Sequence, residues 1–231
     1  MDNEMLMKTK LLITIADKDK IDRIMKLFKR HKVTYSCSIN GVGTASSSLL
    51  SYFGLDEVKK SVVLTVIPIP LENKIFYDLH NKLELYRPGN GICFSISITS
   101  ASRYLSNIYK DINNKEDYSM VNDREYELVV LIVSEGYAST AMDAAKRVGA
   151  GGGTLINGIG LGTKEATKFL GITIEPEKDV VLIITPKDEK KKVMEEITTA
   201  VGLSQEGRGV LFSLPVDHVV GLSDKIEFLK N

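Results

Sequence analysis

Two short Gly-x-Gly segments are the residues of this sequence best suited to bind a ligand without catalysis. Gly89-Asn90-Gly91 and Gly207-Arg208-Gly209 each stand directly before an apolar, strand-like run. Successive backbone N–H groups in such a turn can point into one concavity and bind an anion without a cationic side chain. A Gly-x-Gly before a strand is also a common tight turn. The pattern therefore leaves two interpretations, an anion site or a turn without a ligand.

Two long connections form the second feature that a small fold does not require. About 20 residues separate Gly41 from Ser61, and about 20 separate Gly158 from Asp179. Structureless loops of that length inside a compact domain are usually functional or disordered. Both connections are therefore candidate functional segments.

The sequence contains the same module twice. Three separated blocks recur in nearly constant register: 39–43 at 156–160, 62–64 at 180–182, and 89–94 at 207–212. The shift is 156 − 39 = 117 residues for the first block and 180 − 62 = 207 − 89 = 118 residues for the other two. Repetition over three blocks indicates a tandem duplication.

The stretch from Gly149 to Thr163 contains seven glycines but fits neither common nucleotide-binding pattern. No Gly-Lys-Ser/Thr closes a P-loop, and Thr163 stands where the last glycine of a G-x-G-x-x-G fingerprint would be. The first copy has Lys32, Thr34, Tyr35 and Ser36 where the second has glycines. Because the module itself does not demand glycine there, we interpret the stretch as a close approach of the backbone to a ligand or a neighbouring subunit; a flexible turn is the alternative.

Each copy predicts the element order βαββαβ. In the second copy, the apolar run 128–133 is typical of a strand buried on both faces. A helix is expected from the capping-box-like Thr140 and Asp143 to about Val148, with Gly149 as its stop. The remaining expected elements of this copy are strands at 154–156 and 180–184, a helix at 188–201 and a strand at 210–216.

The first copy gives the same order, with a strand at 11–15 and a helix capped by Asp19. We therefore predict an α+β protein with two ferredoxin-like (βαββαβ) domains in tandem. The first domain is expected at 1–100, a linker at 101–124 and the second domain at 125–231. The two cysteines, Cys37 and Cys93, lie in strand-like patterns and are interpreted as buried thiols.

Composition narrows the classes of function. The 30 basic and 30 acidic residues cancel, which argues against nucleic acid as a partner. The N-terminal segment has no apolar h-region, and no apolar run approaches the ~20 residues of a membrane span. We expect a folded, cytoplasmic protein.

The second copy resembles the nitrogen-regulatory PII family of signal-transduction proteins, in "GGTLINGIGLGTKEATKFLGITIEPEKDVVLIITP" and "GRGVLFSLPVDHVVGL". The first copy resembles it more weakly. The resemblance implies that the long connections are T-loops, the Gly-x-Gly turns B-loops, and the assembly a homotrimer. In that family, adenine nucleotides bind in clefts between subunits and reshape the T-loop, which docks on a regulated enzyme or transporter.

Carried over residue by residue, the resemblance implies ligand-binding positions in both copies. In the second copy these are Gly158 and Gly160 at the T-loop base, Lys178 before the third strand, and Gly207, Arg208 and Gly209 in the B-loop. In the first copy they are Gly41, Gly43, Lys60, Gly89, Gly91 and Arg103.

The chain also departs from the family pattern. Val210 replaces the phosphate-binding lysine of the B-loop, Gly162 and Ala45 replace a glutamine that holds magnesium and 2-oxoglutarate, and Gly221 lies where C-terminal arginines are expected. Arg208 supplies a cation that pairs well with phosphate. AMP, ADP or a different small anion therefore fits these changes better than Mg-ATP with 2-oxoglutarate.

The sequence thus predicts a non-catalytic regulator with no resident cofactor. It would bind a small anionic metabolite (AMP, ADP or ATP) and control a partner protein, for which a membrane transporter is one target that the resemblance implies. Two alternatives stay open: an enzyme acting on a nucleotide, and a metal-binding trimer like the CutA proteins.

Overall fold

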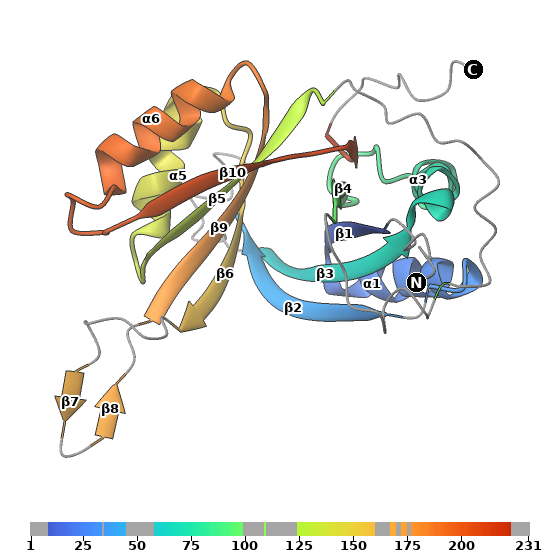
Figure 1. The fold of residues 1–231 in the computed structure, drawn as a ribbon, viewed down its shortest axis with the longest axis horizontal. Coiled ribbons are helices and arrows are strands. Elements are labelled where there is room, and N and C mark those ends of the chain that lie inside the picture. Colours follow the sequence, from blue (N-terminus) through green and yellow to red (C-terminus); the bar gives the residue numbers. More distant parts are fainter. Residues whose placement is uncertain are drawn as a thin grey trace, which may run out of the picture. The chain divides into compact units, whose positions relative to one another are not determined.

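The computed structural model describes residues 9–33, 35–44, 58–98, 109, 124–159, 167–169, 172–174 and 177–222. They fall into two compact units (Figure 1). Unit 1 comprises Met1–Ile39, Ser61–Arg124 and Val216–Asn231, and unit 2 comprises Asn40–Lys60 and Glu125–Pro215. Both units combine helices with antiparallel strands, which confirms the α+β class. No helix in the described ranges is long and apolar enough to cross a membrane.

Unit 1 is built around the antiparallel strand order β2-β3-β1-β4-β11. Its elements are β1 (Thr9–Ala16), α1 (Lys18–Arg30), β2 (Ser36–Gly43), β3 (Val58–Pro68), η1 (Ile69–Leu71), α3 (Glu72–Asn81), β4 (Ile92–Ser97) and β11 (His218–Val220). The ends of β2 and β3 run into 40–60, which belongs to unit 2. Helices α1 and α3 pack together, and the core under them includes Leu12, Phe28 and Leu79.

Unit 2 has the strand order β10-β5-β9-β6. Its elements are β5 (Tyr126–Ser134), α5 (Ala138–Arg147), β6 (Thr154–Ile159), β7 (Thr167–Phe169), β8 (Ile172–Ile174), β9 (Glu177–Pro186), α6 (Lys190–Val201) and β10 (Val210–Pro215). Helices α5 and α6 pack side by side over a core that includes Leu131, Met142 and Ile183 (Figure 1). Strands β7 and β8 pair as a hairpin within the long connection.

The strands of the two units pair in the same register once the sequence shifts are applied. Lys10 lies opposite Ile67 and Ser97, and Glu127 lies opposite Thr185 and Pro215. These positions correspond because 10 + 117 = 127, 67 + 118 = 185 and 97 + 118 = 215. A slip of one residue would turn every side chain to the other face, so this agreement is specific.

The predicted helix starts were wrong. Helix α1 begins after Asp17 rather than Asp19, and α5 begins after Tyr137, so Thr140 lies inside the helix. Neither N-cap side chain makes a capping hydrogen bond. The predicted stop of α5 is confirmed, because Gly149 has a positive φ of 107°. Lys32 at the corresponding place after α1 also has a positive φ, 58°.

Two further features differ from the prediction. Cys93 is buried as predicted, but Cys37 is exposed. Burial raises the pKa of the Cys93 thiol to about 12. Strand β11 was not anticipated: it pairs antiparallel with β4, with Val219 opposite Phe94. Of the predicted linker 101–124 the structure describes Tyr109 and Arg124; Tyr109 is buried and donates a hydrogen bond to the Val66 carbonyl at 2.6 Å.

A buried polar network connects β11 with the rest of unit 1. The Lys10 ammonium lies 2.8 Å from Glu72 Oε2 and 3.4 Å from Asp217 Oδ2. His218 Nδ1 lies 2.9 Å from Glu72 Oε1, and Arg124 Nε donates to Asp217 Oδ1 at 3.0 Å. Burial acts to raise the pKa of Glu72, but the hydrogen bond and charge of His218, together with Lys10, outweigh it and lower that pKa.

Unit 2 carries the same ion pair with its charges exchanged. Lys190 Nζ lies 3.1 Å from Glu127 Oε1. Glu127 corresponds to Lys10 and Lys190 to Glu72, since 10 + 117 = 127 and 72 + 118 = 190. In both units the pair joins the first strand of the sheet to the start of the second helix.

Replacing Glu72 by Gln removes the nearer of the two carboxylates beside the buried Lys10 ammonium and leaves Asp217 at 3.4 Å. We expect the free energy of unfolding to fall by about 3 kcal/mol, because removing one member of a buried ion pair is strongly destabilising. Glu72 stabilises the wild type fully above the unfolded-state pKa of about 4.3, and this contribution disappears as the pH falls through the lower folded-state pKa. Urea unfolding across this pH range measures both effects.

Glu84→Gln is the matched control, since Glu84 forms an exposed pair with Arg87 at 2.9 Å. Such pairs contribute little to stability, so we expect no measurable loss. Equal losses in the two variants would contradict the special role of the buried pair.

Candidate functional site

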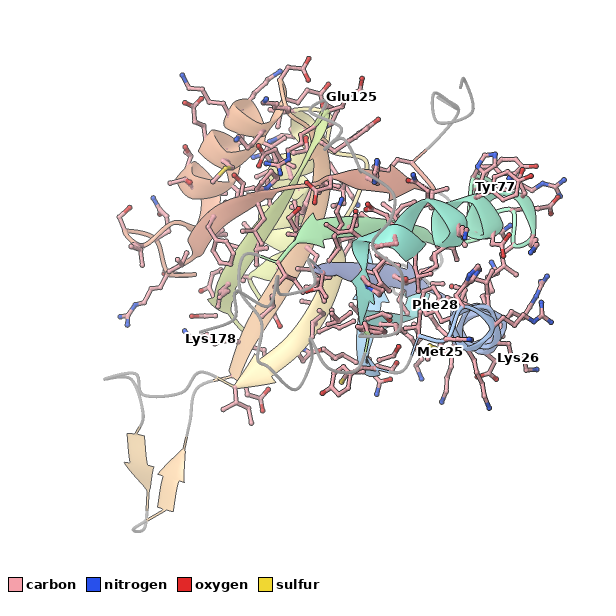
Figure 2. All side chains as sticks on the ribbon, turned by 45° about the vertical axis from the view of Figure 1, so that its right-hand side comes forward. Met25, Lys26, Phe28, Tyr77, Glu125 and Lys178 are labelled. Atoms are coloured by element: carbon pink, nitrogen blue, oxygen red, sulfur yellow. The ribbon has the colours of Figure 1, made fainter. Side chains whose placement is uncertain are left out.

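Three of the predicted ligand-binding residues meet at one end of the unit 2 sheet. Lys178 lies at the start of β9 (Figure 2). It is opposite both Gly158 on β6 and Ser134 on β5. Its ammonium donates a hydrogen bond to Ser134 Oγ at 3.3 Å. The backbone N–H of Ser134 donates to the Gly207 carbonyl at 2.9 Å. We name Ser134, Gly158, Lys178 and Gly207–Gly209 the sheet-end site.

Carboxylates line the same end of the sheet. Asp179 is buried and accepts hydrogen bonds from the Gly136 N–H at 3.0 Å and from Asn157 Nδ2 at 3.3 Å. The hydrogen bond and negative charge of Glu177 raise the pKa of Glu135. An anion at this site would be repelled by these carboxylates, so protonation of Glu135 favours anion binding.

The backbone amides of the Gly207–Gly209 turn were expected to bind an anion, but two of them donate hydrogen bonds to nearby backbone carbonyls. Arg208 N–H donates to the Gln205 carbonyl at 3.1 Å, and Gly209 N–H donates to the Val201 carbonyl at 2.6 Å. Arg208 is exposed and has a positive φ of 47°. Two backbone donors of the turn therefore hold the turn itself, and anion binding by these amides stays a prediction.

Close packing explains both glycines of this turn. A Cβ atom at Gly209 would lie 2.6 Å from the Val201 carbonyl oxygen, and one at Gly207 would lie 3.1 Å from Val133 and Val201 side-chain carbons. Atoms do not approach that closely without displacing the backbone, so the geometry of the turn requires glycine at 209.

The remaining predicted residues lie elsewhere or outside the described residues. Gly41 and Gly43 are buried in β2, where Gly43 pairs with Thr154, and Lys60 lies in β3; all three belong to segment 40–60 of unit 2. Gly89 and Gly91 form a turn of unit 1 with positive φ values of 82° and 114°. Gly160, Gly162, Ala45 and Arg103 lie outside the described residues.

The glycine-rich stretch before β6 is approached closely by another part of the same unit. Thr44 N–H donates to the Gly153 carbonyl at 2.9 Å, and Gly153 N–H donates to Thr44 Oγ1 at 2.8 Å. A Cβ at Gly153 would lie 3.0 Å from Met142 Sδ and 3.1 Å from the Leu182 carbonyl oxygen. At this position the backbone does approach a neighbouring segment, while Gly151 has open space around it.

Sequence reasoning missed the polar residues Ser134, Glu135 and Asp179. Their signal was weak, because each follows or begins an apolar run and looks like an ordinary strand end. No group of three or more His, Cys, Asp or Glu side chains within the described part of the chain is arranged to hold a metal ion.

Comparison with known proteins gives weak similarities. No protein-family model and no curated protein matches the chain. A crystal structure of Arabidopsis thaliana PII bound to citrate is 22% identical and covers 42% of this chain and 80% of its own, with a TM-score of 0.32. A crystal structure of an unknown protein from Galdieria sulphuraria is 13% identical and covers 90% of this chain and 98% of its own, with a TM-score of 0.29.

Gly209→Ala tests whether packing requires glycine in the turn. We expect the free energy of unfolding to fall by about 2 kcal/mol, because the new methyl group must displace the Val201 carbonyl. Gly151→Ala is the control, since a Cβ there meets nothing within 4 Å. Chemical denaturation of both variants measures the difference. A Gly209→Ala protein as stable as the wild type would show that the turn adjusts freely.

Proposed function

We propose that this chain is a tandem PII-like signal-transduction protein of two ferredoxin-like domains. It acts without catalysis: it binds a small anionic effector, such as AMP, ADP or ATP, and thereby controls a partner protein through its two long connections. The observation that carries the proposal is the sheet-end site, where Lys178 and Gly207 both contact Ser134 and Gly158 lies opposite Lys178.

Two structural agreements support the tandem arrangement. The strands of both units pair in the same register under the shifts of 117 and 118 residues. The ion pair Lys10–Glu72 reappears as Glu127–Lys190, with exchanged charges at corresponding positions. Such an exchange is expected after a duplication, when a substitution that reverses the charge of one partner is compensated by a second substitution that reverses the charge of the other.

The effector would bind mainly through side-chain cations. Two amides of the 207–209 turn already donate within the turn, so Lys178 and Arg208 supply the positive charge that a phosphate needs. Binding at the base of the connection 158–179 would change the population of its conformations, provided that the effector binds those conformations with different affinity. The conformation favoured by the effector would then bind the partner, with a membrane transporter as one candidate.

Assembly into a homotrimer is part of the proposal and is supported by one face of the unit 2 sheet. Side chains alternate between faces along a strand, and Val129, Leu131 and Val133 face the helices. The opposite face carries large hydrophobic side chains that are exposed: Ile132, Val210, Phe212 and Leu214. A contiguous apolar face of this kind is typical of an interface, and we assign a second copy of this chain as its occupant.

Catalysis is the competing function, and the Ser134–Lys178 contact is the observation that favours it. A serine hydroxyl beside a lysine occurs in some hydrolases. In this contact the ammonium donates to Ser134 Oγ, whereas a general base would have to accept the hydroxyl proton. Phosphate release from ATP or ADP at a rate abolished by Ser134→Ala would overturn the non-catalytic proposal.

Calorimetric titration with AMP, ADP, ATP and 2-oxoglutarate tests the effector. We expect saturable binding of at least one adenine nucleotide, weakened roughly tenfold by Lys178→Gln or Arg208→Gln because a charged hydrogen bond is lost. Lys187→Gln removes an exposed lysine beyond the other end of β9 and should leave binding unchanged. No heat with any of the four ligands would refute the nucleotide proposal.

Light scattering after gel filtration tests the assembly. We expect the wild type to have the mass of three chains, and Phe212→Lys to release monomers because it places a charge in the apolar interface. Leu203→Lys introduces the same charge at an exposed leucine away from that face and should keep the trimer. A monomeric wild type would contradict the proposal.

A further inference from the structure

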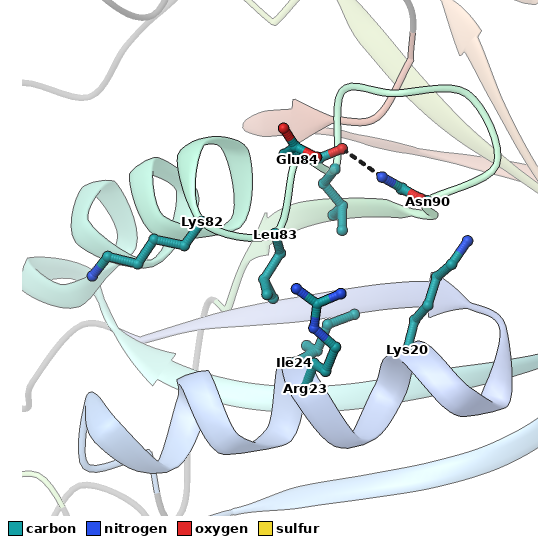
Figure 3. Close-up of a pocket in the computed structure, with 8 residues that line it drawn as sticks. Lys20, Arg23, Ile24, Lys82, Leu83, Glu84 and Asn90 are labelled. Atoms are coloured by element: carbon teal, nitrogen blue, oxygen red, sulfur yellow. Dashed lines mark hydrogen bonds between the residues drawn. The ribbon is translucent and has the colours of Figure 1, made fainter.

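Unit 1 contains a pocket of about 70 Å³ between α1 and the segment that follows α3 (Figure 3). It is lined by the residues Lys20, Arg23, Ile24, Lys82, Leu83, Glu84, Leu85 and Asn90. Ile24 and Leu85 are 1% exposed and form an apolar floor. Asn90 belongs to the 89–91 turn, so the pocket lies directly beside the first Gly-x-Gly segment.

The charged groups around the pocket are not equivalent. Figure 3 shows the Arg23 guanidinium and the Lys20 ammonium extending from neighbouring turns of α1 toward segment 83–90, whereas the Lys82 ammonium points away. Lys82 lies 2.8 Å from Asp78, and Glu84 lies 2.9 Å from Arg87. Lys20 lies 3.1 Å from Asp17 and also donates to the Gly89 carbonyl.

Arg23 differs from these residues because it forms no ion pair within the described part of the chain. It is exposed at the rim, and a guanidinium presents several N–H donors in a fixed plane. Asn90 Nδ2 donates to the Glu84 carbonyl at 3.0 Å, and an amide nitrogen carries a second hydrogen that can donate elsewhere. The pocket thus offers two cations and an amide donor above an apolar floor.

The cations that line this pocket are present in unit 1 but absent from the corresponding positions of unit 2. Under the sequence shifts, Lys20 corresponds to Tyr137 and Arg23 to Thr140, since 20 + 117 = 137 and 23 + 117 = 140. Lys82 corresponds to Ala200, since 82 + 118 = 200. If these cations served only to stabilise the fold, unit 2 would need an equivalent.

We propose that this pocket binds one phosphate-sized oxyanion, either free inorganic phosphate or the phosphate group of a small metabolite. Arg23 is the principal ligand, assisted by Lys20 and the Asn90 amide. Ligand pockets for drug-sized molecules usually exceed about 300 Å³, so a whole nucleotide cannot enter this one. A bound oxyanion competes with the Gly89 carbonyl for Lys20, which connects the pocket to the 89–91 turn.

Phosphate titration of the full chain, followed by NMR of methyl groups, tests the site. We expect saturable shifts of the Ile24, Leu83 and Leu85 methyl signals at millimolar phosphate, and at least a roughly tenfold weaker affinity in Arg23→Gln because a charge-assisted hydrogen bond is lost. Lys26→Gln removes an exposed cation of the same helix that does not line the pocket, and should bind as the wild type does (Figure 2).

Each outcome decides the proposal. Absence of saturable shifts in the wild type, or equal weakening in Arg23→Gln and Lys26→Gln, would overturn it. If AMP shifts the same methyl signals with the same dependence on Arg23, the metabolite's phosphate is the source; shifts with inorganic phosphate alone identify the free ion. The sheet-end site is tested separately, because Lys178→Gln should leave these shifts unchanged.

Discussion

The arrangement of each unit depends on one constraint: its first strand is hydrogen-bonded on both sides. β1 lies between β3 and β4, and β5 lies between β9 and β10. A strand in this position has its backbone polar groups satisfied by two neighbours. Its register cannot slip by one residue without turning its helix-facing side chains outward. The ends of the neighbouring strands are therefore held in fixed relation to one another.

The two ends of β5 make different kinds of contact with the neighbouring segments. At its beginning, Glu127 pairs with Lys190 and joins the sheet to α6. At its end, Ser134 contacts Lys178 through its hydroxyl and Gly207 through its backbone N–H. The Glu127–Lys190 pair stabilises the fold. The contacts of Ser134 bring together the segments of Lys178 and Gly207, which lie 207 − 178 = 29 residues apart in the sequence. Next to this second contact, the hydrogen bond and negative charge of Glu177 raise the pKa of Glu135.

The sequence predicts the strands well because a buried strand has a strong local signal, a continuous apolar run. The runs at 128–133 and 180–184 both lie in strands of the structure. Helix starts failed, because the backbone of Asp17 and Tyr137, not a side-chain cap, accepts the first helical bonds. Strand β11 and the Lys10–Glu72–Asp217 network could not be predicted, because they join residues up to 207 positions apart, from 10 to 217. Asp179 was missed because it begins an apolar run and looks like an ordinary strand end.

The glycines of the Gly-x-Gly motif have a different physical explanation from the one that the sequence suggests. The motif Gly207-Arg208-Gly209 predicts backbone amides that are available to bind an anion. In the structure the Gly209 N–H donates a hydrogen bond to the Val201 carbonyl, and the same carbonyl leaves no space for a Cβ at position 209. A glycine pattern required for packing can be present in both units whether or not either binds a ligand. The side chains around the two turns, in contrast, differ between the units. Under the 117- and 118-residue shifts, Arg208 of unit 2 stands where unit 1 has Asn90, whereas Lys20 and Arg23 of unit 1 stand where unit 2 has Tyr137 and Thr140.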